Sequence, residues 1–248
     1  MNRFYLLLLS FTLSVSCIGQ GFTSPYRLGI QVDVPMAVTG VSFLTASTLM
    51  GTTKTLPPKE AILALNRNEV NRFDRGATRQ NSKVAAYLSD ATMYAAMALP
   101  LLHLANRNSR KDFGTVAAMS AEVFVVNVGI TNLIKESVSR KRPLLYNPDV
   151  PMERKLKKDN FKSFFSGHTS TVSSMSFFFA QSFADYNPNS KLKPMVWSLS
   201  AALPIVTGLL RYKAGKHYWT DVLVGYAVGA VIGVGVPWLH KTAVGLNK

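Results

Sequence analysis

The chain has 248 residues, 48% of them hydrophobic, and its 28 Lys and Arg against 13 Asp and Glu give a formal net charge of +15. The basic residues lie in short segments between apolar stretches, and no familiar nucleic-acid-binding motif accompanies them. We therefore expect membrane lipids, and no nucleic acid, as partners. The single cysteine, Cys17, excludes an intramolecular disulfide.

The N-terminus has the features of a secretory signal. Arg3 precedes an apolar stretch at residues 4–15, and small residues follow as far as Gly19. We expect residues 1–19 to be a signal peptide, whose cleavage makes Gln20 the first residue. Lipidation of Cys17 is the alternative, although no leucine stands at the usual position before it.

Six apolar segments follow, and several approach the roughly 20 residues that a helix needs to cross a bilayer. They lie at residues 34–49, 84–104, 113–134, 168–184, 194–210 and 220–239. Together they predict an all-α, multi-span helical membrane protein with a core of about six helices. The first segment is short and rich in Thr and Ser, so it is predicted either to cross the membrane or to form a buried or re-entrant helix.

Proline and glycine positions refine this layout. Pro100 and Pro204 are expected to kink their helices without abolishing them. Glycines at 225, 229 and 233 suit close packing of the last helix against a neighbour. The segment 52–83, with two prolines and mixed charges, is predicted to be an interfacial amphipathic connector. This gives N-terminal helices and the connector at 20–112, a core at 113–240 and a basic tail at 241–248.

Two clusters between the apolar segments predict an anion-binding site. Lys135 and Arg142 follow the segment 113–134, and Ser166 and Gly167 immediately precede the segment 168–184. A guanidinium group matches the geometry of phosphate oxygens, and the start of a helix supplies unpaired amides and a favourable dipole. With Arg211 further along, three cations and a helix start describe a phosphoryl-transfer site.

A third cluster supplies the reactive group. If the chain is helical from His217 onward, Asp221 lies one turn further on the same face. Its carboxylate could then hold one imidazole nitrogen and leave the other free. A histidine held in this way can act as a nucleophile or a base. His168 provides a second imidazole next to Gly167.

Each cluster also has an ordinary interpretation. Ser166 could be only a helix N-cap, His217 and Asp221 a solvated or capping pair, and the basic run at 140–162 a loop facing water or anionic lipid. The occurrence of all three clusters in one chain favours the site. His103 and His240 match no cluster and are expected at an interface or the surface.

The three clusters resemble the motifs K-x6-RP, PSGH and SR-x5-H-x3-D of the type 2 phosphatidic acid phosphatase and vanadium haloperoxidase superfamily, PAP2. The first motif fits completely from Lys135 to Pro143. Phe165 replaces the proline of the second motif, and Leu210 replaces the serine of the third, which removes one possible hydroxyl contact to phosphate. The resemblance covers roughly residues 113–240 and implies a PAP2-type helical core.

The resemblance also implies roles for the motif residues. His217 would attack phosphorus to form a phosphohistidine, Asp221 would orient its ring, and His168 would protonate the leaving oxygen and later activate water. The phosphate oxygens would be held by five groups, those of Lys135, Arg142, Ser166, Gly167 and Arg211. No metal and no cofactor is implied.

The expected function is hydrolysis of a lipid phosphomonoester or diphosphate, and the motifs do not choose among phosphatidic acid, phosphatidylglycerol phosphate, an isoprenoid diphosphate and lipid A. A vanadate-dependent haloperoxidase and a non-catalytic lipid-binding protein are the alternatives. Because nearly every loop is basic, loop charge does not orient the chain. A cleaved signal followed by six crossings predicts a site in the cytoplasm. If the first apolar segment does not cross the membrane, the site is predicted to lie outside the cytoplasm. The resemblance implies the bacterial inner membrane with the site facing the periplasm.

Overall fold

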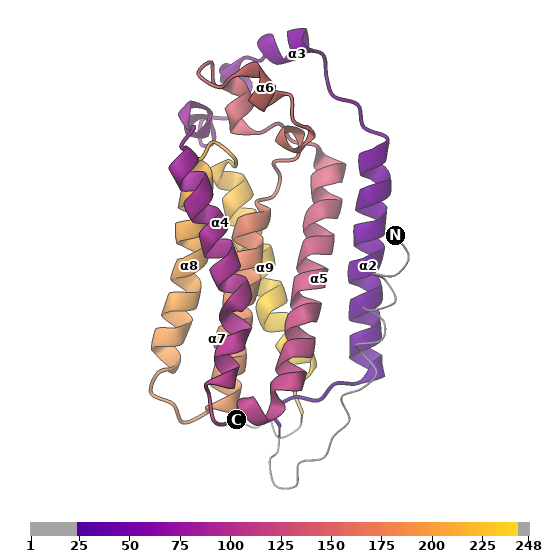
Figure 1. Cartoon of the computed structure of the whole chain (residues 1–248), viewed down its shortest axis with the longest axis vertical. Coiled ribbons are helices and arrows are strands. Elements are labelled where there is room, and N and C mark those ends of the chain that lie inside the picture. The colour runs from indigo at the N-terminus through magenta and orange to yellow at the C-terminus, as the bar shows by residue number, and fades with distance from the viewer. Residues whose placement is uncertain (1–23, 243–248) are drawn as a thin grey trace.

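The computed structural model describes residues 24–242, and its long helices form one bundle (Figure 1). The expected signal peptide, Cys17 and most of the basic tail lie outside the described residues. The six long helices are α2 (Ile30–Thr52), α4 (Lys83–Ala98), α5 (Phe113–Val138), α7 (Gly167–Tyr186), α8 (Lys193–Lys213) and α9 (Trp219–Leu239). Within residues 24–242 there is no β-strand, only an isolated bridge between Tyr26 and Lys241. The all-α fold with about six core helices is confirmed.

Helix α7 is the centre of the bundle, and α9 packs along it. Small residues allow this approach: a methyl group on Gly225 would lie 2.6 Å from the Ser166 carbonyl oxygen, and one on Gly229 would lie 2.7 Å from Ser173 Cβ. Serines line the facing side of α7, and Ser173 Oγ donates to the Tyr226 carbonyl at 2.8 Å. The glycine pattern of the last helix is thus explained by close packing against α7.

Within residues 24–242, four helical segments are long and apolar enough to cross a membrane: 30–52, 110–146, 193–213 and 219–239. The first segment is longer than its sequence pattern indicated. Helix α2 runs along α5 for most of the height of the bundle (Figure 1), and Gly40 lies against the Val125 side chain. Its outer face is apolar and exposed, as at Ile30, 81% exposed, which is the face that lipid would cover.

The two prolines act differently from each other. Pro204 lies inside α8, which continues from Lys193 to Lys213. Pro100 instead ends a helix: α4 stops at Ala98, and the chain continues as a 3₁₀ helix, Leu99–Leu104. The proposed single helix over 84–104 was therefore wrong at its C-terminal end. Pro100 cannot donate a backbone hydrogen bond, and its ring clashes with the preceding turn.

The connector between α2 and α4 folds over one end of the bundle. It contains α3 (Lys59–Leu63) and two 3₁₀ helices, Arg67–Glu69 and Arg75–Arg79. Near the same end lies α6 (Met152–Lys155), part of the α5–α7 loop that also carries 3₁₀ helices at Pro143–Tyr146 and Lys158–Phe161 (Figure 1). Asp74 and Ala77 of the connector are fully buried. The connector is therefore packed against protein as well as placed near the expected membrane surface.

The prediction that His103 and His240 are interfacial or surface residues was wrong. His103 is fully buried in the 3₁₀ helix after α4, where Nε2 lies 2.9 Å from Ser182 Oγ. The His240 residue is 2% exposed at the end of α9. Each ring finds polar partners on another helix, and such partners make burial of a histidine favourable.

Candidate active site

The first motif lies where α5 ends. Lys135 is in the last turn, and Ser139 terminates the helix with a left-handed backbone, φ 48°. Arg142 follows in an extended backbone conformation, and the residue is 2% exposed. Its Nε donates to the Asp159 carbonyl at 2.9 Å, and its Nη2 lies 2.8 Å from Asp159 Oδ2. One edge of the guanidinium is thus anchored. Its Nη1 has no hydrogen-bond partner within residues 24–242.

The second motif opens α7, as predicted. Ser166 is the N-cap, and its Oγ accepts from the Thr169 amide at 3.4 Å. The capping interpretation is therefore correct, and it places the Gly167 amide at the positive end of the helix. A methyl group on Gly167 would lie 3.4 Å from Lys135 Nζ. The ammonium of the first motif therefore reaches the helix start of the second.

The third motif joins α8 to α9. Arg211, 5% exposed, lies in the last turn of α8. Its Nη1 donates to Ser89 Oγ at 3.2 Å and lies 3.6 Å from Asp90 Oδ1, both on α4. Its Nε has no hydrogen-bond partner in the described chain. Arg211 therefore resembles Arg142 in being anchored on one side only.

His217 does not begin a helix, contrary to the sequence hypothesis. Helix α9 starts at Trp219, and Asp221 is in its first turn, where Oδ2 accepts from the Tyr218 amide at 2.9 Å. His217 Nδ1 lies 3.5 Å from the same oxygen. That distance is an ion-pair contact rather than a hydrogen bond. Neither His217 nitrogen has a hydrogen-bond partner among the described residues, and the side chain is fully buried.

Burial lowers the pKa of His217 well below its ordinary value, and the positive charges of Arg142, Arg211 and Lys135 add to this effect. These are the cations of the first and third motifs, so the structure gathers them around one imidazole. Burial and the same two arginines also lower the pKa of Lys216 to about 8. The ring of His217 is therefore held neutral.

Asp221 is fixed by residues that the motif analysis missed. Arg140 Nη1 donates to Asp221 Oδ1 at 2.5 Å, while its Nη2 donates to Asp74 Oδ2 at 2.8 Å. Ser163 Oγ donates to the other oxygen of Asp221, and Thr220 Oγ1 donates to Asp74 at 2.7 Å. The buried carboxylates of Asp221 and Asp74 thus share one guanidinium. Arg140 lies inside the first motif, but the spacing gave no reason to select it.

Asp90 is a second residue that sequence reasoning missed. It lies on α4, and its Oδ1 is 2.7 Å from His168 Nε2. His168 therefore has a carboxylate partner of its own. A lone acidic residue inside the apolar segment 84–104 was the signal that could have revealed it, because such residues are rare in membrane helices.

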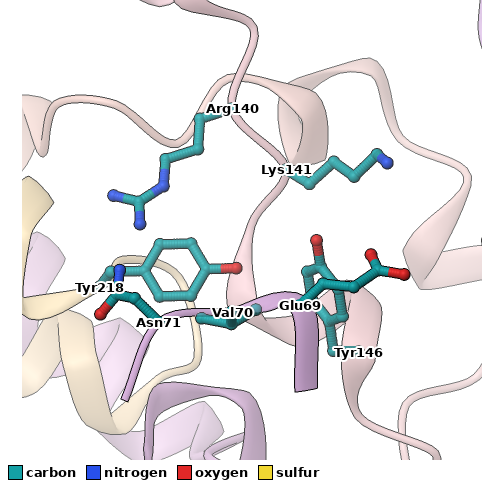
Figure 2. A pocket seen from close by; sticks show the side chains of 7 residues that line it. All are labelled: Glu69, Val70, Asn71, Arg140, Lys141, Tyr146 and Tyr218. Atoms are coloured by element: carbon teal, nitrogen blue, oxygen red, sulfur yellow. The ribbon is translucent and has the colours of Figure 1, made fainter. Parts of the chain in front are cut away.

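A cavity of about 280 Å³ adjoins this cluster on the side of the connector (Figure 2). The Arg140 guanidinium covers the Tyr218 ring there, with Cζ 4.0 Å from the ring centroid. The other lining residues are Glu69, Val70, Asn71, Lys141 and Tyr146. None of the eight predicted site residues lines it. The cavity therefore lies beside the motif residues and is not the space that they surround.

The described geometry is suited to an anion. Arg142 Nη1 and Arg211 Nε are buried donors without partners, and the neutral imidazole of His217 lies among the same charges. A buried donor left unpaired costs on the order of 1–3 kcal/mol. A ligand with several acceptor oxygens would remove this cost, as a phosphate group does.

Comparisons with known proteins agree with this arrangement. The family model described as the PAP2 superfamily matches residues 116–244. Phospholipid phosphatase 1 of Rattus norvegicus is 31% identical over 127 residues, 42% of this chain and 45% of the relative, so the chain matches less than half of that protein's length. The crystal structure of the first transmembrane PAP2 type phosphatidylglycerolphosphate phosphatase from Bacillus subtilis has a TM-score of 0.53 at 20% identity, covering 82% of this chain and 96% of that one. At this identity the likeness is one of fold.

Proposed function

Because this chain belongs to the PAP2 superfamily, we propose that it is an integral-membrane lipid phosphate phosphatase that needs no metal for turnover. The substrate class is a phosphomonoester or diphosphate on a lipid, such as phosphatidic acid, phosphatidylglycerol phosphate, an isoprenoid diphosphate or lipid A. The names of the two similar proteins, both phosphatases, support the reaction. The apolar, exposed faces of the candidate spans support a substrate that arrives from the bilayer.

One observation carries the proposal: two buried arginines from different motifs each keep an unpaired nitrogen beside an unpaired, buried histidine. Arg142 precedes α7 in the sequence and Arg211 follows it. Other nitrogens of both side chains already donate hydrogen bonds to protein groups. This leaves one fixed nitrogen of each arginine free to donate. Such donors stabilise charge on phosphate oxygens without reorganising during the reaction.

In the proposed mechanism, His217 Nε2 attacks phosphorus, because Nδ1 faces Asp221. The P–N bond forms as the bond to the lipid oxygen breaks, and His168 gives a proton to that oxygen. Water then attacks phosphorus, His168 takes its proton, and the P–N bond breaks to release inorganic phosphate and neutral His217. Asp221 stabilises the imidazole while it carries the phosphoryl group.

The remaining site residues bind the substrate in this proposal. Lys135 and the Gly167 amide lie close enough together to hold one face of the phosphate, and the two arginines hold the others. Ser166 Oγ already caps α7 and lies 2.9 Å from Thr169 Oγ1. It would contribute its hydroxyl only by exchanging that local bond for one to phosphate.

The enzyme test is phosphate release by purified protein in detergent from a panel of the four lipid phosphates. We expect His217→Ala and His168→Ala to remain folded and lose turnover. Rapid-quench trapping should find an acid-labile phosphoenzyme in the wild type and none in His217→Ala. Lys141→Ala is the matched control, because Lys141 is exposed and belongs to no motif position.

Three results would contradict this function or its mechanism. An undiminished phosphoenzyme in His217→Ala would assign the nucleophile to another residue. Halide oxidation with added vanadate and peroxide that exceeds phosphate release would favour the haloperoxidase alternative. Release from none of the four lipids, together with saturable lipid binding, would favour the non-catalytic alternative.

We also propose the bacterial inner membrane, with the site facing the periplasm, on the strength of the family resemblance. Helix α2 begins at the end of the bundle remote from the motif loops (Figure 1). If α2 crosses the membrane, a periplasmic site requires its start to be cytoplasmic. A cleaved secretory signal would deliver that start to the periplasm instead. In a chain with six crossings, cleavage of the signal and a periplasmic site therefore exclude each other.

Cysteine labelling in intact cells separates these alternatives. In a Cys17→Ser background, Lys157→Cys reports on the site end, and Arg107→Cys reports on the opposite end; both residues are exposed. A membrane-impermeant maleimide should label the Cys at 157 before lysis and the Cys at 107 only afterwards. The reverse pattern would place the site in the cytoplasm.

A further inference from the structure

Three ionisable side chains meet at the end of the bundle remote from the motif loops. Asp33 is in the first turn of α2, Glu122 lies on α5, and His240 caps the end of α9. His240 Nε2 lies 2.8 Å from Asp33 Oδ1 and 3.3 Å from Glu122 Oε2. One ligand atom from each residue lies within 4.8 Å of the other two. The sequence separation of Asp33 and His240, 207 residues, hid this cluster from pattern analysis.

The hydrogen bonding of His240 fixes its tautomer. Nδ1 lies 2.8 Å from the Val236 carbonyl oxygen, which can only accept, so Nδ1 carries a proton. In a neutral ring Nε2 then presents a lone pair to two carboxylate oxygens. Three electron-rich atoms facing one another repel unless a positive charge lies between them. That charge can be a proton, on the ring or on a carboxyl group, or a metal ion.

The geometry is compatible with a metal ion. Zinc binds histidine nitrogen and carboxylate oxygen at about 2.0–2.2 Å in a tetrahedron, so its ligand atoms lie about 3.3 Å apart. The Glu122–His240 distance of 3.3 Å has this value, and the Asp33–His240 distance of 2.8 Å needs only a small outward shift. Metal-binding histidines commonly donate their other N–H to a backbone carbonyl, as His240 does to Val236.

The burial and charge of the three side chains are also compatible with a bound metal ion. The side chains of His240 and Glu122 are 0% and 13% exposed, whereas Asp33 is 32% exposed and opens the cluster to solvent. Glu122 Oε2 is buried and has no hydrogen-bond partner within the described residues. When both carboxylates are ionised and the imidazole is neutral, the cluster has a charge of −2, which a divalent cation balances. The nearby Lys241 ammonium is engaged elsewhere, 3.0 Å from Asp185.

We propose that Asp33, Glu122 and His240 form a structural site for a divalent transition-metal ion of the zinc type, with a fourth position open to water. The ion would join α2 to α5 and to the end of α9. Helix α2 otherwise contacts the bundle mainly through α5. The site lies at the opposite end of the bundle from the motif residues, so it acts on stability and not on the phosphoryl-transfer chemistry. The inference does not depend on the proposed function.

The experiment uses the full chain in detergent, stripped with EDTA and then desalted. Zinc chloride is added, unbound metal is removed, and bound zinc is measured by elemental analysis beside the apparent melting temperature. We expect one equivalent of zinc and a higher melting temperature in the wild type. Glu122→Gln should weaken zinc binding about 10–100-fold or more, because it replaces a charged ligand with a neutral amide.

Controls separate this site from other zinc ligands. Asp185→Asn changes a carboxylate at the same end of the bundle outside the cluster, and it should keep its equivalent of zinc. His168→Ala should also keep it, which excludes binding at the motif histidines. If Glu122→Gln fails to fold, Asp33→Asn is the second variant, since Asp33 is the most exposed ligand.

The proposal fails if the wild type binds no zinc, or if Glu122→Gln and Asp33→Asn bind zinc as tightly as the wild type. It also fails if the melting temperature responds to pH but not to zinc. That result would identify the positive charge as a proton, on His240 or on a carboxyl group.

Discussion

The guanidinium groups of Arg142 and Arg211 are buried, anchored on one side and unpaired on the other. Their fixed geometry matters as well as their charge, because contacts of the planar guanidinium with protein aim its free nitrogen, whereas a lysine ammonium on a flexible chain is not held in the same way. Arg142→Lys and Arg211→Lys should each lower kcat/KM about 10²–10³-fold, the cost of removing one preorganised donor to a developing oxyanion. Lys141→Ala should retain activity. Full activity in both arginine variants would show that positive charge alone binds the phosphate.

The neutral state of His217 predicts an unusual pH response. Its folded pKa is lowered by burial and by Arg142, Arg211 and Lys135, whereas the unfolded pKa is about 6.5. Below pH 6.5 the unfolded chain binds a proton that folded His217 does not, so this residue's contribution to stability is present above that pH and lost as the pH falls.

Carbon-13 NMR of labelled histidines, with His217→Gln used for assignment, should show one imidazole that stays neutral below pH 6. The apparent melting temperature of the wild type should fall more between pH 7 and pH 5 than that of His217→Gln. A midpoint near 6.5 for His217 in the substrate-free protein would contradict the buried, positively surrounded site.

The pair of buried carboxylates around Arg140 gives a third prediction at the residue scale. Arg140 bridges Asp221 and Asp74, so Arg140→Ala should leave both carboxylates without their cationic partner and displace Asp221 from His217. We expect kcat to fall about tenfold or more with a smaller change in KM, because Arg140 faces Asp221 and not the unpaired donors. Arg140→Lys should restore part of kcat. An unchanged kcat in Arg140→Ala would remove Arg140 from the positioning of Asp221.

At the scale of elements, the interface of α7 and α9 couples packing to the site. A methyl group on Gly225 would lie 2.6 Å from the carbonyl oxygen of Ser166, the N-cap of α7. Gly225→Ala should therefore destabilise the protein by about 1–3 kcal/mol through overpacking and also lower turnover, because it moves the second motif. Gly235→Ala is the matched control on the same helix, since nothing lies within 4 Å of its added methyl group. Equal melting temperatures for the two variants would contradict the close packing.

At the scale of the whole molecule, the two ends of the bundle should respond separately to chelation. Phosphate release at a temperature well below melting should resist EDTA, because three cations already occupy the role that a divalent metal plays against substrate charge. Vanadate, which can become five-coordinate, should inhibit in the absence of EDTA. The melting temperature, in contrast, should fall on chelation if the Asp33 cluster holds its ion. Turnover that stops with EDTA and returns with magnesium would contradict the phosphohistidine mechanism.

The sequence by itself predicted the helical membrane fold and the three motifs, because both signals are local. Apolar length predicts a helix without reference to any neighbour, and Lys135 to Pro143 is a spacing within one short segment. The placement of the motifs at helix ends was also predictable, since Ser166 and the apolar run after it indicate a helix start.

Only the tertiary structure decided which distant residues support those motifs. Asp90 meets His168 across 78 residues, and Asp74 meets Arg140 across 66. A charged residue in an apolar segment or a connector does not reveal its partner, because that partner depends on which helices pack side by side. The same reason explains His240, whose burial beside Asp33 follows from the packing of α2 and α9 around α5. Local spacing determines an element and its reactive groups, whereas three-dimensional packing determines burial, charge pairing and the neutral state of His217.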